Sequence, residues 1–459
     1  MTLIKSVLLG SAATLVVVAG AQAADLPTKK GAPAAEYVKV CKVGGIAGFI
    51  IPGSDTCLKI SGGVFAMASA GNLDLGHNPT AAGWALANTK YRDDVGLYGR
   101  ADLGLEAVSN TAYGPLVSVI DIHWDQGYGM NQAGPNWSYI NNAYIQWAGL
   151  TAGIHTSFYD YIGGGETWFN IISPEHTGTG VPLFAYTATF GGGFSATISA
   201  EENTNATTGR PTIANGPEQF NAFALDTYLG ARAPDLVGSL DLTQSWGTAH
   251  LAGVAHNYRI EDAGGNDIDG WGYGVLGGIG FNLPMLGAGD VFKVQAAYSH
   301  AAVGYSGFTT SGWGGGNGPG ANNGLNMNGN GYIYSLQDAV SPGLGVWSLP
   351  TTWEVAAVLE LNVTPQFAID PEISYGQISW SNRGAASFAL LEGNADSWLG
   401  GVAFHWKPVT NLSFNLDVVY QSSHFDASRV AGTGAVGTAG YAATTADGFN
   451  GRLLVERDF

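Results

Sequence analysis

Beyond its N-terminal end, this sequence lacks any uninterrupted run of about 20 apolar residues, the length that a membrane-spanning helix requires. Charge is scarce as well, because only 12% of the 459 residues are Asp, Glu, Lys or Arg. The chain has two cysteines, and its nine histidines form neither HxH nor HExxH spacing. These absences exclude a helical membrane protein, and they offer no sequence sign of a metal centre. We therefore expect no metal and no cofactor.

What the sequence does contain is glycine and aromatic residues: 69 Gly, 13 Trp, 20 Tyr and 19 Phe. In a transmembrane barrel one half of each strand faces lipid and the other half faces water, which explains a mixed, weakly charged composition. The length alone would allow two or three soluble domains. No linker or shift of composition divides the chain, however, so one continuous barrel is the better interpretation.

The spacing of strand-like segments supports a closed barrel. Long links strictly alternate with short ones between sixteen segments, as in outer-membrane barrels with short periplasmic turns and long external loops. The segments are 58–68, 95–108, 115–125, 138–148, 150–157, 182–191, 194–202, 235–244, 248–259, 271–283, 290–303, 351–361, 367–380, 396–407, 412–424 and 447–459. The predicted fold is all-β, a 16-stranded antiparallel transmembrane β-barrel, closed by a last strand that ends in Phe459.

Alternation of residue type along these segments indicates a water-filled interior. In 97–107, for example, apolar residues such as Leu97 and Leu103 oppose Arg100, Asp102 and Glu106. An unpaired charge is too costly to bury in a dry core, so the polar face requires water. Sixteen strands are enough to enclose an aqueous channel.

The N-terminal end has the features of a secretory signal. Lys5 precedes the apolar run 7–20, and an Ala-Gln-Ala motif follows at 21–23. The run is too short for a membrane anchor. We predict a signal peptide at 1–23, a periplasmic segment at 24–57 and the barrel at 58–459.

Export would place the two cysteines, Cys41 and Cys57, in an oxidising compartment. We expect a disulfide between them. The spacing and the lack of a nearby histidine disfavour a two-cysteine metal site or a redox motif.

Several blocks of sequence resemble the general porins of alphaproteobacteria. They are Asp25-Leu26-Pro27, the cysteine pair within IPGSDTCLKISG, AYIQWAGLTAG at 143–153, PDLVGSLDLTQSWG at 234–247, LPMLGAGD at 283–290, HWKPVTNLSFNLDVVY at 405–420 and the final GRLLVERDF. The resemblance implies a homotrimer in the outer membrane of a Gram-negative bacterium, with the third long loop folded into the lumen. Two positions depart from the family pattern, because His155 and Leu454 stand where an Arg is common.

The third long link, 158–181, is the segment that matches the inward-folded loop, and it carries Asp160, Glu166 and Glu175 but no Lys or Arg. The alternative is that these acids form a solvated external loop. Opposite this loop we place charged residues whose parity points to water, so that the constriction selects counter-ions and favours cations weakly. These wall residues are Arg100, Asp102, Glu106, Asp121, His123, Lys293 and Arg452.

The expected function is a channel for passive diffusion of ions and small hydrophilic solutes, and not an enzyme. A channel specific for one solute, such as a sugar, is the main alternative; an adhesive barrel and an outer-membrane hydrolase are weaker ones. The glycines at 274–280 resemble a dinucleotide motif, but no helix follows them. The expected surroundings are outer-membrane lipid and lipopolysaccharide, with no nucleic acid.

Overall fold

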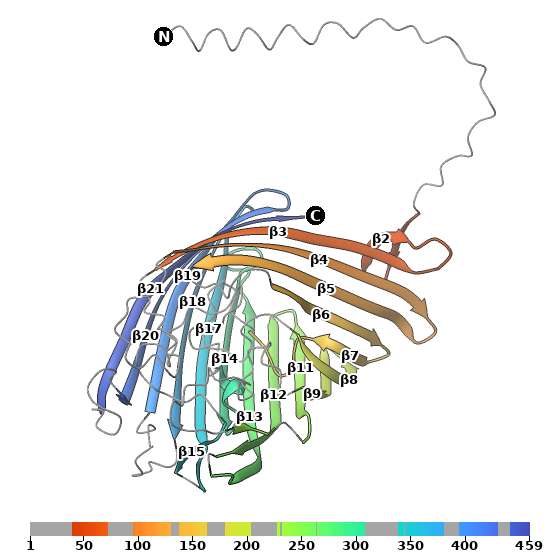
Figure 1. Cartoon of the computed structure of the whole chain (residues 1–459). Helices are drawn as coiled ribbons and strands as arrows, with labels where there is room; N and C mark the ends of the chain where they lie inside the picture. Colours follow the sequence, from red (N-terminus) through yellow and green to blue (C-terminus); the bar gives the residue numbers. More distant parts are fainter. Residues whose placement is uncertain are drawn as a thin grey trace, which may run out of the picture. The chain divides into compact units, whose positions relative to one another are not determined.

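A computed structural model describes residues 39–71, 95–129, 137–162, 180–202, 227–229, 232–262, 264–307, 338–343, 345–380, 394–429 and 441–459. The chain divides into two units, Met1–Val40 and Cys41–Phe459. The second unit is a barrel (Figure 1). The predicted signal peptide at 1–23 lies outside the described residues.

Sixteen strands form the wall of the barrel in the described part of the chain, each antiparallel to its neighbours. Their number and order confirm the prediction. In order around the wall they are β3 (Cys57–Gly71), β4 (Val95–Thr111), β5 (Gly114–Gly129), β6 (Trp137–Trp147), β7 (Leu150–His155), β8 (Val181–Gly191), β9 (Phe194–Glu201), β11 (Asp235–Gln244), β12 (Gly247–Glu261), β13 (Asp267–Asn282), β14 (Val291–His300), β17 (Pro350–Thr364), β18 (Phe367–Trp380), β19 (Asn394–Val409), β20 (Leu412–Arg429) and β21 (Tyr441–Asp458).

The barrel closes where β21 pairs with β3, in a register that runs from Asn450 opposite Gly71 to Asp458 opposite Gly63. At the end of this seam Phe459 and Gly62 exchange two backbone hydrogen bonds, of 2.9 and 3.3 Å. Closure leaves β3 and β21 with a partner on each side, so neither is an exposed edge.

The structure also contains elements that the sequence pattern did not predict. A hairpin of β1 (Val40–Val43) and β2 (Ile46–Ile50) precedes the wall, and β2 pairs with β3. Short strands β10 (Thr227–Tyr228), β15 (Val340–Gly343) and β16 (Val346–Ser348) lie in long links. The segment predicted as one strand over 290–303 ends at His300, because Ala301 adopts a left-handed φ of 48°, and a 3₁₀ turn, η3 (Val303–Ser306), follows.

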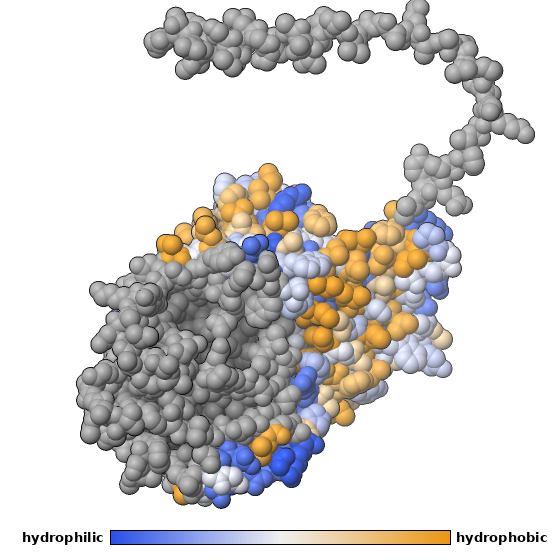
Figure 2. All heavy atoms as spheres, in the orientation of Figure 1, coloured by the Kyte–Doolittle hydropathy of each residue, from blue (hydrophilic) through white to orange (hydrophobic). Residues whose placement is uncertain are grey.

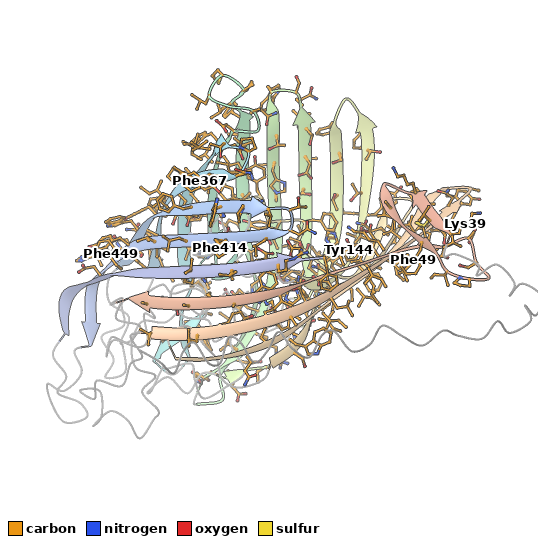
Figure 3. The ribbon with its side chains drawn as sticks, turned by 90° about the horizontal axis from the view of Figure 1, so that it is seen from above. Lys39, Phe49, Tyr144, Phe367, Phe414 and Phe449 are labelled. Atoms are coloured by element: carbon orange, nitrogen blue, oxygen red, sulfur yellow. A yellow bond between two sulfur atoms is a disulfide. The ribbon has the colours of Figure 1, made fainter. Side chains whose placement is uncertain are left out.

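The two faces of the wall differ in residue type as the alternation predicted, but the inward carboxylates are not all open to water. Leu97 and Ile198, on the apolar parity, are 70% and 71% exposed, whereas Glu354 and Asp417 on the opposite parity are buried. Figure 2 shows hydrophobic residues gathered over the outside of the described wall. Figure 3 shows the same strands from above, with Phe367 labelled on β18, Phe414 on β20 and Phe449 on β21. No helix in the described residues is long and apolar enough to cross a membrane.

The predicted disulfide is confirmed. Cys41 in β1 is bonded to Cys57 at the start of β3, with 5.8 Å between their Cα atoms. Cys57 is fully buried, and the bridge packs with Ile46 and Val108. The bridge therefore fastens the N-terminal hairpin to the first wall strand.

Candidate pore constriction

The third long link turns into the barrel directly after β7. Ser157 Oγ donates a 2.5 Å hydrogen bond to Glu201 Oε2, and the Phe158 amide donates to Glu201 Oε1 at 3.1 Å. Glu201 is fully buried at the end of β9. Two charge-assisted hydrogen bonds to one carboxylate fix the direction of the turn, so β7 ends at His155 instead of extending to 157 as the sequence suggested.

The next residues of this turn pack against the inner wall. Tyr159 is fully buried and its ring lies edge-on to that of Tyr305, with 4.9 Å between centroids. The apolar cluster around it comes from the inward parity of four successive strands and from η3. Its members are Val237, Ala252, Val254, Leu276, Ala297, Ala302 and Tyr305. The described start of the loop therefore lies inside the barrel, as predicted.

Two further residues of the turn, Tyr161 and Ile162, contact the inner wall. Tyr161 stacks on His250 and its hydroxyl lies 2.8 Å from Thr248 Oγ1, both on β12. The Ile162 amide donates a 2.9 Å hydrogen bond to Gln295 Oε1 on β14, and Ile162 packs against Ala356 of β17. Phe158, Tyr159, Tyr161 and Ile162 thus contact the inner wall on strands from β9 to β17.

Of the three acids predicted in this loop, Asp160 lies in the described inward turn, where its amide bonds to the Ser157 carbonyl at 3.4 Å. Glu166 and Glu175 lie outside the described residues.

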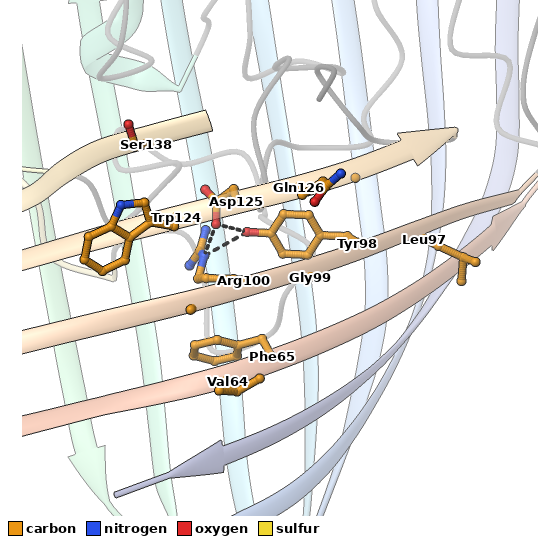
Figure 4. A pocket seen from close by; sticks show the side chains of 12 residues that line it. Val64, Phe65, Leu97, Tyr98, Gly99, Arg100, Trp124, Asp125, Gln126 and Ser138 are labelled. Atoms are coloured by element: carbon orange, nitrogen blue, oxygen red, sulfur yellow. Dashed lines mark hydrogen bonds and ion pairs between the residues drawn. The ribbon is translucent and has the colours of Figure 1, made fainter. Parts of the chain in front are cut away.

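Four of the predicted wall residues, Arg100, Asp102, Asp121 and His123, lie on the adjacent strands β4 and β5. Arg100 is held by side chains outside this set. Arg100 Nε donates a 2.8 Å hydrogen bond to Asp125 Oδ1, and its Nη2 donates to the Tyr139 hydroxyl at 2.9 Å. Tyr98 also donates to Asp125. Figure 4 shows Arg100, Tyr98 and Asp125 joined beside Phe65. Arg100 is therefore anchored to the wall by charge-assisted hydrogen bonds, and its partners Asp125, Tyr98 and Tyr139 were not in the predicted set of wall residues.

The other three members of this group adjoin Arg100. In the register of β4 and β5, Asp102 lies opposite His123, and Asp121 lies two residues before His123. His123 Nε2 is 3.4 Å from Asp121 Oδ1. Glu106, further along β4, is half-buried opposite Val119. The predicted wall set is thus partly a compact cluster and partly dispersed.

The remaining two predicted residues lie on other stretches of wall. Lys293 Nζ forms a 2.7 Å ion pair with Glu360, near the ring of Tyr161. Arg452 is 1% exposed and interacts electrostatically with Asp417 and Glu372. Around these two bases, β17, β18 and β20 present inward-facing carboxylates that the sequence analysis did not select: Glu354, Glu360, Asp370, Glu372 and Asp417.

A second inward segment follows β14 and was not predicted. The imidazole of His256 lies between two buried carboxylates, 2.8 Å from Asp235 and 3.1 Å from Asp338. The Tyr305 hydroxyl donates to Asp235 at 2.5 Å, and the Val303 amide donates to Asp338 at 2.8 Å. These bonds join β11, β12 and η3 to the far end of the longest link. The bonded residues are 21 to 82 positions apart in the sequence, so no local motif predicts the contacts.

Asp262, which follows β12, has a structural role. It accepts hydrogen bonds from the amides of Gly264, Asn266 and Gly345. Burial by itself would raise the pKa of Asp262, but these amide donors outweigh it and lower the pKa to about 2. The carboxylate therefore fastens the β12–β13 link to the segment that contains β16.

Comparison with known proteins agrees with this architecture. A family model described as porin subfamily matches residues 25–451. Porin Omp2b of Brucella suis biovar 1 is 31% identical over 418 residues, which cover 87% of this chain and 98% of that protein. Porin Omp2b of Brucella melitensis biotype 1 has the same identity and coverage.

Among solved structures, the outer membrane channel DcaP of Acinetobacter baumannii matches 90% of this chain and 100% of its own chain, with a TM-score of 0.56 and 14% sequence identity. This likeness concerns the fold.

Proposed function

Because the chain belongs to the porin subfamily and is an outer-membrane channel for passive diffusion, we propose that it is a weakly cation-selective pore for ions and small hydrophilic solutes. The observation that supports the cation preference is the excess of inward-facing carboxylates over bases on this stretch of wall, among which Glu360 is partly exposed beside Lys293, with 26% of its side chain accessible. Fixed charge that lines a narrow pore selects ions of opposite sign.

The inward loop adds to this preference. Asp160 belongs to the turn that crosses the inner wall, and Glu166 and Glu175 extend the same acidic segment. Screening over roughly 8–10 Å at physiological salt confines the effect of each charge to the constriction. The selectivity is therefore expected to be weak in the wide parts of the channel and to arise at the narrowest one.

The reversal potential under a KCl gradient tests the selectivity. We expect a cation-selective potential that falls when Asp160, Glu166 and Glu175 are changed together to Asn, Gln and Gln. The control is Asp55→Asn, in the exposed turn between β2 and β3, which should leave the potential unchanged. Anion preference in the unmodified pore would contradict the proposal, and an unchanged potential in the triple variant would remove this loop from the constriction.

A channel specific for one solute, such as a sugar, remains the alternative to a general pore. Recording the ion current across a bilayer with added solutes distinguishes the two. A specific solute blocks the current of a specific channel saturably, whereas a general pore shows no such block. We propose the general pore, since the constriction described above is dominated by charge.

We further propose that the mature protein starts near Ala24, after removal of 1–23, that 24–57 lies in the periplasm, and that three chains assemble. The family resemblance supports the homotrimer. Electrophoresis of unheated, detergent-solubilised protein tests it: a band at the trimer mass is expected, and a monomer alone under mild conditions would contradict it. Lipid and lipopolysaccharide are proposed to surround the outer face.

A further inference from the structure

A compact set of metal-ligating side chains faces the lumen on β4 and β5. Asp102, Asp121 and His123 each offer one donor atom, two carboxylate oxygens and one imidazole nitrogen, and these atoms lie within 4.8 Å of one another. The strand register creates the set, because Asp102 is directly opposite His123 and Asp121 shares the parity of His123. The described residues contain no other group of three such side chains with donor atoms this close.

Residues outside the set hold two of its members in the orientation that ligands need. The Tyr139 hydroxyl lies 3.0 Å from His123 Nδ1, which leaves Nε2 on the side of Asp121 Oδ1, 3.4 Å away. Asn141 Nδ2 donates a 2.7 Å hydrogen bond to Asp121 Oδ2, which leaves Oδ1 for the cluster. Partners of this kind fix ring orientation and ligand basicity in metal sites.

The third member has an unsatisfied atom. Asp102 Oδ1 is buried and accepts no hydrogen bond from the residues that the structure describes. The side chains of His123 and Asp121 are only 11% and 24% exposed. A buried carboxylate oxygen without a partner is costly, and Arg100, the base beside it on β4, is directed to Asp125 and Tyr139. A bound cation would satisfy this oxygen.

We propose that Asp102, Asp121 and His123 bind a divalent transition-metal ion, with Zn²⁺ as the matching ion, on the inner wall of the channel. One nitrogen and two oxygen ligands suit Zn²⁺, with water in the open position. Mg²⁺ and Ca²⁺ prefer sites made of oxygen alone, so the imidazole discriminates against them. The bound ion adds positive charge to a lumen through which ions pass, so Zn²⁺ reduces the cation current reversibly.

The experiment measures binding directly and conduction separately. Purified protein in detergent is titrated with ZnCl₂ by calorimetry, and single-channel current is recorded with ZnCl₂ and, for comparison, MgCl₂. The variants are His123→Gln and Asp102→Asn. His405→Gln is the matched control, because His405 also lies on the inner wall with a carboxylate, 2.9 Å from Asp370 Oδ2, but without a third ligand.

We expect one Zn²⁺ per chain in the unmodified protein, affinity at least ten-fold weaker in both site variants, and unchanged affinity in the control. Zn²⁺ should reduce the current at concentrations where Mg²⁺ does not. Absence of Zn²⁺ binding, or binding in His123→Gln and Asp102→Asn as tight as in the unmodified protein, overturns the proposal. Binding that Mg²⁺ reproduces also overturns it. The calorimetric readout does not depend on ion selectivity, so failure here is distinguishable from failure of the proposed cation preference.

Discussion

Gly278 on β13 leaves the space that the ring of Tyr161 fills, because a Cβ atom on Gly278 would lie 2.1 Å from Tyr161 Cδ1. The adjacent Gly277 has open space at the same position, with nothing within 4 Å. The glycines that resembled a nucleotide-binding motif therefore serve a different purpose. Gly274, Gly278 and Gly280 lie against Tyr159 or Tyr161 and make room on the wall for the inward turn.

Gly278→Ala should displace the inward turn, residues 158–162, from the barrel wall. Because two non-bonded heavy atoms cannot lie 2.1 Å apart, the ring of Tyr161 must shift away from β13, which disturbs its stacking on His250. We expect a changed single-channel conductance and larger fluctuations of the open-channel current in a planar bilayer. Gly277→Ala is the matched control and should behave as the unmodified channel. Identical current traces for both variants would show that the turn does not depend on this contact.

Loss of the disulfide should destabilise the barrel without altering permeation. The bridge spans 16 positions of sequence and lies between the N-terminal hairpin and β3. On the chain-entropy model such a loop contributes about 3 kcal/mol. The Cys41→Ser, Cys57→Ser double variant should unfold at a lower denaturant concentration, as measured by the electrophoretic shift on unfolding, with its conductance nearly unchanged. A large conductance change would place the bridge in the permeation path.

Arg452→Gln should be strongly destabilising. Asp417 lies directly opposite Arg452 in the register of β20 and β21, and Glu372 is its second electrostatic neighbour. Removing one member of a buried charge group costs about 3–5 kcal/mol, and both carboxylates here are nearly inaccessible. Denaturant unfolding measures the loss. Adding Asp417→Asn to Arg452→Gln should recover part of it, whereas equal or greater destabilisation in the double variant would contradict a charge effect.

His256→Ala should loosen the connection between η3 and the wall. The imidazole lies between Asp235 and Asp338. Its removal leaves two buried carboxylates facing each other without the donor that separates them. We expect destabilisation of about 3 kcal/mol or more in denaturant unfolding. His300→Ala removes a half-buried imidazole that contacts Thr351 Oγ1 at 3.2 Å, and should cost about 1 kcal/mol. Equal losses in the two variants would refute a special role for His256.

Asp262 should make stability depend on acid pH. Its pKa in the folded protein is about 2, below the ordinary value of about 3.9 for Asp in an unfolded chain. A lowered pKa stabilises the fold fully above pH 4, and the contribution disappears as pH falls from about 4 to about 2. Asp262→Asn should therefore be less stable at pH 7, and its thermal midpoint should approach that of the unmodified protein in this window. A constant difference across the window would disprove the linkage.

The sequence by itself determined the wall of this barrel. The number and order of the strands follow from the alternation of long and short links, and the lipid and lumen faces follow from a two-residue period, since both are local properties of the chain. Residues such as Leu97 and Arg100 could be assigned to opposite faces because successive side chains of a strand must point in opposite directions. The pairing of Cys41 with Cys57 followed because only two cysteines exist.

Only the tertiary structure decided what lies inside the wall. Parity identified Asp102, Asp121 and His123 as inward-facing, but their convergence depends on the register between β4 and β5, which parity does not give. Glu201, Gly278 and Asp338 act on residues 44, 117 and 82 positions away. Such partners carry no local pattern, because an inward loop is held by side chains that closure of the barrel brings together.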